Sequence, residues 1–166
     1  MKKVIIIGSP GSGKSTFARK LEAITGLPLF YLDMLYWNED KTTVSKEVFL
    51  ERLQSIMENE KWIIDGNYAS TMEMRIKACD SVFFLDYPTD ICLKGIEERK
   101  GKPRPDMPWL EAENQDDEFI NFIKNYSLEQ RPKVMKLLEK YSEKNVIIFC
   151  SREESEKFLE TIKRRK

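Results

Sequence analysis

Near its N-terminus the chain reads Val4-Ile5-Ile6-Ile7-Gly8-Ser9-Pro10-Gly11-Ser12-Gly13-Lys14-Ser15-Thr16, and this segment sets the architecture of the whole chain. Its apolar first part is rich in β-branched residues and ends at a glycine, which predicts a short, buried, parallel strand. The part from Gly8 to Ser15 matches the pattern G-x-x-x-x-G-K-[ST] in full, and residues 14–25 then read as a helix. A strand, this loop and a helix in that order form the context in which the pattern binds phosphate.

Phosphate binding by this loop depends on its backbone and on two side chains. Its glycines let the chain curl so that successive N–H groups point inward at phosphate oxygens, and the following helix adds the positive end of its dipole. Lys14 is expected to reach the β- and γ-phosphates, and the Ser15 hydroxyl is expected to ligate Mg²⁺. A chance glycine-rich turn is the alternative, and the strand–loop–helix context disfavours it. The sequence thus predicts a nucleoside triphosphate and Mg²⁺ as cofactors, with ATP chosen and GTP still open, held by Gly8, Ser9, Pro10, Gly11, Ser12, Gly13, Lys14, Ser15 and Thr16.

The rest of the chain alternates between short apolar runs and longer stretches of helical periodicity. Such alternation predicts βα units, in which a mostly parallel sheet is covered by helices on both faces. The length of 166 residues fits one domain over residues 1–166. Further strands are expected at 27–32, 62–65, 82–86 and 146–150, and helices at 45–59, 70–78, 88–100, 111–126, 132–141 and from 151 onward.

Composition excludes several classes of function. With 28 Lys and Arg against 28 Asp and Glu, the chain carries no net charge, so it has no general attraction for DNA, RNA or an anionic membrane. The absence of histidine excludes a Ser-His-Asp triad, an HExxH zinc site and a histidine proton shuttle. No apolar run is long enough for a signal peptide or a membrane span, and three cysteines without CxxC spacing fit a reducing compartment. We therefore expect a cytoplasmic protein without a membrane partner and without direct nucleic-acid binding.

One segment, 99–108, interrupts the helical pattern with three prolines, one glycine and four cations. A helix cannot continue through such a sequence, so a loop is expected there. It is either a solvated surface loop or a mobile cationic lid, around residues 99–109, that closes over an anion. For Arg99 and Arg104, which flank the proposed lid, both interpretations stay open, whereas a solvated surface is favoured for the two lysines between them.

Five short segments with chemically distinctive residues follow the phosphate loop along the chain. Their order and spacing carry more information than any one of them alone. They are Leu32-Asp33-Met34-Leu35-Tyr36-Trp37, Trp62-Ile63-Ile64-Asp65-Gly66-Asn67-Tyr68, Leu85-Asp86-Tyr87-Pro88, Arg104-Pro105-Asp106-Met107 and Arg131-Pro132.

Together with the loop, these segments resemble the adenylate-kinase-like P-loop kinases over nearly the whole chain. They are most similar to the small bacterial branch labelled topology modulation proteins, or FlaR-like proteins. The resemblance implies an α/β fold of the P-loop NTPase type, a three-layer αβα sandwich. Its five-stranded parallel sheet would have the order 2-3-1-4-5, with a short lid over an acceptor region.

The resemblance assigns two carboxylates to the site. Asp33 ends the second strand, at the sheet edge where ligands of parallel sheets gather. Similar kinases place there an acid that orients or deprotonates the acceptor hydroxyl, or holds Mg²⁺ through water; a helix N-cap is the alternative role. For the magnesium-linked aspartate, the hydrophobic pattern favours Asp86, whereas the resemblance favours Asp65, which precedes Gly66. We choose Asp65 for a water-mediated metal contact and expect Asp86 to be structural.

The acceptor region departs from adenylate kinase. That enzyme holds the phosphate of AMP with two arginines, and here Tyr36 and Ala69 stand at those places. Because a monophosphate without such cations would be poorly held, we expect a hydroxyl-bearing or nucleoside-like small-molecule acceptor, with nucleotide acceptors still open. Arg75 either replaces a missing arginine or lies on the surface, and the aromatic side chains either line the acceptor site or belong to the core. The candidate substrate-binding residues are Asp33, Tyr36, Trp37, Asn67, Tyr68, Arg75 and Arg131.

These features predict a Mg²⁺-dependent phosphotransferase that moves the γ-phosphate of ATP to a small acceptor. Catalysis is assigned to Lys14 and Asp33, and to the lid residues Arg99 and Arg104, since similar kinases use lid arginines to neutralise charge on the transferred group. A GTPase or an ABC-type ATPase is disfavoured because NKxD and LSGGQ segments are absent. The alternative function is a regulatory nucleotide-binding protein, or an ATPase that affects DNA topology without small-molecule kinase activity.

The last candidate site residue is Arg152, which falls where the related folds contact the adenine ring. Its neighbour Ser151 has a second interpretation, because Ser151-Arg152-Glu153-Glu154 has the spacing of a helix capping box.

Overall fold

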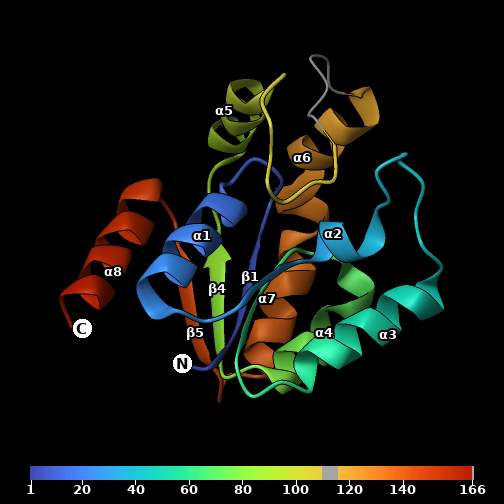
Figure 1. Ribbon diagram of the computed structural model, residues 1–166. Coiled ribbons are helices and arrows are strands. Elements are labelled where there is room, and N and C mark those ends of the chain that lie inside the picture. The colour runs from blue at the N-terminus through green and yellow to red at the C-terminus, as the bar shows by residue number, and fades with distance from the viewer. Residues whose placement is uncertain (110–115, 166) are drawn as a thin grey trace.

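The computed structural model describes residues 1–109 and 116–165 (Figure 1). Its five strands form one parallel sheet in the order β2-β3-β1-β4-β5. The predicted order 2-3-1-4-5 is therefore confirmed, and β1, which carries the glycine-rich loop at its end, lies in the middle. The strands are β1 Lys3–Gly8, β2 Leu29–Tyr31, β3 Trp62–Asp65, β4 Ser81–Leu85 and β5 Asn145–Phe149.

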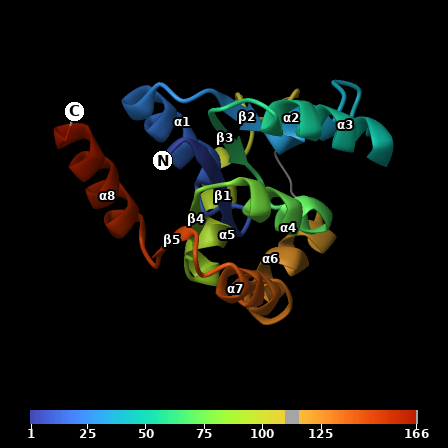
Figure 2. The same cartoon turned by 90° about the horizontal axis from the view of Figure 1, so that it is seen from below.

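Helices cover both faces of the sheet, as the apolar character of the central strands requires. Side chains of β1 alternate between the two faces: Val4 and Ile6 pack on one side, Ile5 and Ile7 on the other, and all four are fully buried. Figure 2 shows α1 and α8 on the first side and α3, α4 and α7 on the second. These helices span Lys14–Thr25 (α1), Lys46–Met57 (α3), Ala69–Ala78 (α4), Arg131–Lys140 (α7) and Arg152–Arg164 (α8).

Three more helices stand near the carboxyl ends of the strands, where the loops converge (Figure 1). They are α2 (Leu32–Tyr36), α5 (Thr89–Arg99) and α6 (Asp117–Glu129). Residues 100–109 contain no helix or strand, in agreement with the expected break after Arg99. The expected helix at 111–126 is seen from Asp117 onward, and residues 110–115 lie outside the described residues. No described helix is long and apolar enough to cross a membrane.

Capping residues explain where several helices begin. Ser45 caps α3 by accepting a hydrogen bond from Val48 N–H at 3.2 Å, and Ser151 caps α8 by accepting one from Glu154 N–H at 3.2 Å. The cap of α2 is Tyr31, whose side chain makes no capping hydrogen bond, and Asp33 lies inside this helix. The N-cap alternative for Asp33 is therefore not what the structure shows, and its carboxylate is available for another role.

Candidate active site

The glycine-rich loop joins β1 to α1 through two left-handed residues, Gly11 at φ 81° and Gly13 at φ 90°. It rests directly on the backbone of α5. A Cβ on Gly11 would lie 2.0 Å from the carbonyl oxygen of Cys92, and a Cβ on Gly95 would lie 2.1 Å from the carbonyl oxygen of Gly11. Loop and helix approach this closely only because neither glycine has a side chain. Gly95 was not predicted as a site residue, although a lone glycine inside a helical pattern is a signal of close packing.

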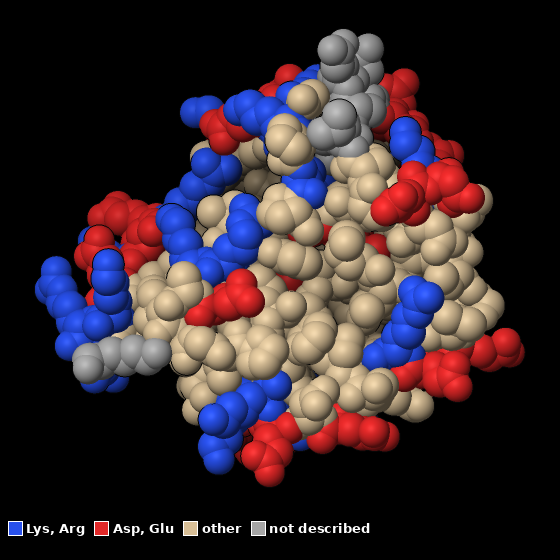
Figure 3. Space-filling model, viewed as in Figure 1, with Lys and Arg blue, Asp and Glu red and all other residues tan. Residues whose placement is uncertain are grey.

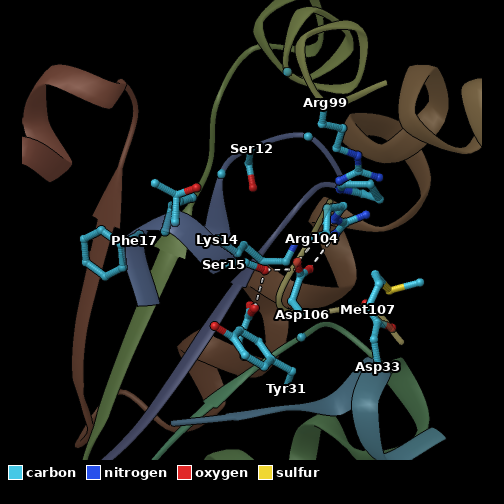
Figure 4. A pocket seen from close by; sticks show the side chains of 18 of the residues that line it. Ser12, Lys14, Ser15, Phe17, Tyr31, Asp33, Arg99, Arg104, Asp106 and Met107 are labelled. Atoms are coloured by element: carbon cyan, nitrogen blue, oxygen red, sulfur yellow. Dashed lines mark hydrogen bonds and ion pairs between the residues drawn. The ribbon is translucent and has the colours of Figure 1, made fainter. Parts of the chain in front are cut away.

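At the start of α1 the Ser15 hydroxyl contacts two carboxylates. Its Oγ lies 2.7 Å from Oδ2 of Asp65 at the end of β3 and 2.9 Å from Oδ2 of Asp106 in the segment after α5 (Figure 4). Lys14 Nζ donates to the carbonyl oxygen of Ser9 at 3.2 Å, within the same loop. Ser15 thus faces carboxylates from two distant parts of the chain.

Burial dominates the electrostatics of this cluster. It raises the pKa of Asp65 to about 6, even though the charge of Lys14 and the hydrogen bond from Ser15 favour the ionised carboxylate. Burial also lowers the pKa of Lys14, and the nearby charges of Asp65 and Asp33 oppose that shift. Groups whose pKa values are moved in this way mark the cavity as a candidate functional site.

Asp86, the competing candidate for the metal-linked aspartate, lies in a different environment. Its carboxylate forms an ion pair with Arg131 at the start of α7, with Nε 2.9 Å from both oxygens and Nη2 2.8 Å from Oδ2. Neither residue lines the cavity around Lys14. This geometry favours Asp65 over Asp86 for a metal contact beside Ser15. It also places Arg131 away from the expected substrate site.

Asp33 approaches the loop from the end of β2, through the short helix α2. The Tyr68 hydroxyl donates a hydrogen bond of 2.6 Å to its Oδ1. Burial raises the pKa of Asp33, whereas the hydrogen bond from Tyr68 and the charge of Lys14 lower it. Tyr68 itself adopts φ 38°, a left-handed backbone that is uncommon for a bulky residue and costs conformational energy.

Arg75 binds the backbone of residues 66–68, which carries Tyr68. The side chain is fully buried, and its guanidinium donates to the carbonyl oxygens of Gly66, Asn67 and Tyr68. Its Nε donates to Thr71 Oγ1 at 3.2 Å. The structure therefore does not bring Arg75 to the substrate cavity, and neither expected position, acceptor clamp or surface, describes it. Its donors are directed to the backbone that carries Tyr68.

Two more predicted substrate-binding residues have structural contacts. The Asn67 side chain exchanges two hydrogen bonds with the backbone of Gly8, at 2.6 and 3.1 Å, and so ties the end of β3 to the phosphate loop. Tyr36 packs edge-on against Trp37, Phe49 and Tyr68, with ring centroids 5.3 to 5.5 Å apart. Asn67 still lines the cavity, whereas Tyr36 supports the residues that do.

The two arginines predicted for a lid lie at the end of α5 and in the segment that follows it. Arg99 lies with its guanidinium carbon 5.8 Å from the centre of the Phe119 ring, a cation–π contact. Arg104 forms an ion pair with Asp106, a carboxylate that is only 3% exposed. Burial alone would raise the pKa of Asp106, but Arg104 and the Ser15 hydroxyl hold it below its usual value. Asp106 was quoted within the Arg-Pro-Asp-Met segment but was not predicted as a site residue.

These elements enclose a cavity of about 910 Å³, at the upper end of the range for small-molecule sites. Lys and Arg side chains gather on the upper left of the face shown in Figure 3, around α1 and α5. Arg152 lines the cavity beside α5, 3.6 Å from Glu98, and Trp37 and Trp109 line it with their ring centroids 5.3 Å apart. The predicted residues that line the cavity are Pro10, Gly11, Ser12, Gly13, Lys14, Ser15, Thr16, Asp33, Trp37, Asp65, Asn67, Tyr68, Arg99, Arg104 and Arg152.

Sheet order and loop geometry define the class of fold: the chain has a P-loop NTPase fold, a five-stranded parallel sheet with helices on both faces. It is similar in fold to a shikimate kinase from Bacteroides thetaiotaomicron, at 19% identity and a TM-score of 0.57, covering 98% of this chain and 96% of that one. A shikimate kinase from Acinetobacter baumannii, solved in complex with shikimate, aligns at 17% identity and a TM-score of 0.61, covering 100% and 96%.

In sequence, the chain is similar to adenylate kinases. Adenylate kinases from Thermotoga petrophila and Thermotoga maritima are each 28% identical to the chain over 94 residues, which is 55% of this chain and 42% of theirs. The chain therefore spans less than half the length of the curated relatives it matches. No family model matches the chain, so its likeness to the topology modulation branch rests on the sequence segments quoted above.

Proposed function

We propose that the chain is a kinase that transfers the γ-phosphoryl group of ATP to a hydroxyl of a small acceptor. The observation that carries this proposal is the convergence of Lys14, Ser15 and Asp33 on one cavity. They come from the ends of β1 and β2, two strands separated by β3, and this is the edge at which parallel sheets bind ligands. The similarity to adenylate and shikimate kinases supports the same class of reaction.

The residues around Ser15 fit Mg²⁺ bound together with a nucleotide. Among the described residues no group of three His, Cys, Asp or Glu side chains is placed to hold a metal by itself. Mg²⁺ does not need such a cage, because it typically binds one or two carboxylates together with waters and substrate phosphates. Ser15 and Asp65 would hold it, and when bound it would neutralise phosphate charge. If Asp65→Asn keeps Mg²⁺-dependent turnover and Asp86→Asn abolishes it, this assignment is reversed.

Each protein group has a defined part in the transfer. Backbone N–H groups of the loop and Lys14 would bind the β- and γ-phosphates, and Asp33 would orient the acceptor hydroxyl and accept its proton. The acceptor oxygen then bonds to the γ-phosphorus as the bond from that phosphorus to the β–γ bridging oxygen breaks, and ADP leaves. Arg99 and Arg104 would neutralise charge on the transferred group. Such chemistry depends on positioning and charge, so it requires no histidine.

The acceptor we propose is an uncharged or nucleoside-like hydroxyl compound. Arg75 is held by backbone carbonyls and Arg131 by Asp86, so neither is placed to clamp a phosphate on the acceptor. The end of the cavity near Asp33 is instead lined by Trp37 and Trp109. Two indole rings offer apolar contact area and favour a flat or apolar acceptor over a strongly anionic one.

ADP release, measured in a coupled assay with nucleosides, nucleoside monophosphates, sugars and shikimate-like acids, tests this proposal. We expect ADP formation to rise at least tenfold with one uncharged hydroxyl class. Asp33→Asn should lower that rate by about 10²–10⁴-fold, as expected for loss of a general base. Turnover with AMP far above all other acceptors would overturn the acceptor assignment. Hydrolysis at one rate, with or without every acceptor, would favour a regulatory nucleotide-binding protein or ATPase instead.

A further inference from the structure

At the start of α1, the single hydroxyl of Ser15 lies within hydrogen-bond distance of two carboxylates. A serine hydroxyl carries a single proton, so Ser15 can donate to only one carboxylate oxygen at a time. Both Asp65 Oδ2, at 2.7 Å, and Asp106 Oδ2, at 2.9 Å, lie within hydrogen-bond distance. One of these oxygen–oxygen contacts therefore lacks a proton between its atoms when both carboxylates are ionised. A cation beside the three oxygens would resolve this.

A second, independent observation also points to a ligand at this place. Asp65 is 5% exposed, and among the described residues none donates a hydrogen bond to its Oδ1. A buried carboxylate oxygen without a partner is costly unless water or an ion completes its surroundings. Asp33 lines the same cavity, so an incoming triphosphate would meet three carboxylates.

We propose that Asp106 is a metal-site residue delivered by the lid: with Ser15 and Asp65 it completes the site for the divalent cation that accompanies the nucleotide. This inference rests on the proposed binding of nucleotide at the loop. Adjacent oxygens around Mg²⁺, each at about 2.0–2.1 Å, lie about 2.9 Å apart, and the Ser15–Asp106 spacing of 2.9 Å matches that edge.

The ion pair between Arg104 and Asp106 links the proposed cation site to the position of Arg104. Because the two side chains are paired, the segment that brings the carboxylate to Ser15 also brings the guanidinium to the phosphate side of the cavity. Figure 4 shows Lys14, Ser15, Arg104 and Asp106 grouped together, with Arg99 entering from α5. Cation binding and placement of Arg104 are thereby coupled.

Calorimetric titration with a non-hydrolysable ATP analogue, with Mg²⁺ and with EDTA, tests this coupling. The quantity to measure is the Mg²⁺ enhancement, which is the dissociation constant in EDTA divided by that in Mg²⁺. It is compared among the wild type, Asp106→Asn and the control Glu97→Gln. Glu97 is exposed on α5 and lies outside the cavity. Glu97→Gln removes one negative charge, as Asp106→Asn does, and therefore serves as the matched control. In EDTA, Asp106→Asn should bind the analogue at least as tightly as the wild type. Its Mg²⁺ enhancement should fall at least tenfold, the usual minimum for loss of a group that supports a metal. Glu97→Gln should keep the wild-type ratio.

One result would overturn the inference: an unchanged Mg²⁺ enhancement in Asp106→Asn. If that variant also binds the analogue more tightly, and equally so with and without Mg²⁺, Asp106 is a latch that only blocks the site. Asp106→Ser serves as a second loss variant should the asparagine variant unfold, and Asp106→Glu should restore part of the enhancement. Absence of binding by the wild type in both conditions would instead refute the proposed function itself.

Discussion

Tyr68 donates a hydrogen bond of 2.6 Å to Asp33, across the space between the ends of β3 and β2. It does so from a left-handed backbone at φ 38° that Arg75 holds through the carbonyl oxygens of residues 66–68. Strain of this kind persists where surrounding structure enforces it, and it often accompanies function. The arrangement fixes the orientation of the carboxylate that faces the proposed acceptor.

Replacing Tyr68 by phenylalanine should change the pH dependence of turnover. Burial raises the pKa of Asp33, and the hydrogen bond from Tyr68 lowers it, so Tyr68→Phe should raise that pKa further. A general base works only when ionised, and the acid limb of kcat/KM should therefore move to higher pH. Profiles from pH 4.5 to 8.5 measure this shift. An acid limb that stays in place, or moves to lower pH, would mean that Asp33 is not the base.

Asp65 should make the unliganded protein less stable as pH rises. Its pKa is raised from 3.8 to about 6 in the folded chain, so between these values the folded state binds more protons than the unfolded state. The free energy of unfolding then falls as pH rises through this window. Asp65→Asn removes that loss, so the free energy of unfolding of the variant relative to that of the wild type should rise by about 2 kcal/mol between pH 4.5 and 7.5. Urea unfolding at pH 4.5 to 7.5 measures it, and parallel curves for the two proteins would contradict it.

Gly95→Ala should displace the phosphate loop, because the added Cβ would clash with the loop backbone from helix α5. Alanine is the better helix former by about 1 kcal/mol, but its Cβ would lie 2.1 Å from the carbonyl oxygen of Gly11. We expect a net loss of about 1–3 kcal/mol in stability, as for an overpacked core, together with weaker ATP binding. Lys94→Ala, on the exposed side of the same helix, is the matched control. Equal ATP affinity in the two variants would show that α5 does not support the loop.

Arg75→Lys tests whether this buried arginine is structural. A lysine cannot reproduce the planar set of donors to three backbone carbonyls, so the free energy of unfolding should fall by at least about 2 kcal/mol. Arg52→Lys is the control, because Arg52 donates to the carbonyl oxygen of Leu35 from an exposed position. Its stability should change by less than about 0.5 kcal/mol. A raised KM for the acceptor without loss of stability would return Arg75 to the substrate site.

Local patterns were sufficient to predict the loop, the strand before it and the helix after it, whereas the sheet order was implied by the resemblance to the adenylate-kinase-like kinases. The run Val4–Ile7 before Gly8 predicted a buried parallel strand, and the glycine spacing predicted the phosphate loop around Lys14. Helix α2 was not predicted in this way, and an N-cap stayed open for Asp33 as the alternative to its favoured role in the site.

Pairing between distant residues could not be predicted. Arg75 and Arg131 looked like candidates for binding an anion, yet one is used by the backbone of residues 66–68 and the other by Asp86. Asp106 is the converse case, a residue that was not predicted as part of the site although the structure places it there. It lies in a segment without periodicity, and only the path of residues 100–109 brings it to Ser15, 91 positions earlier.

Binding of nucleotide to the loop from Gly8 to Ser15 is the premise of the whole account, and calorimetry tests it most directly. Titration of the purified protein with ATP and with GTP, each with Mg²⁺, should show saturable binding of ATP at a stoichiometry near one. Lys14→Met should weaken that binding at least tenfold, since Lys14 would hold the β- and γ-phosphates. Failure of the wild type to take up either nucleotide would contradict the proposed kinase and leave only its fold.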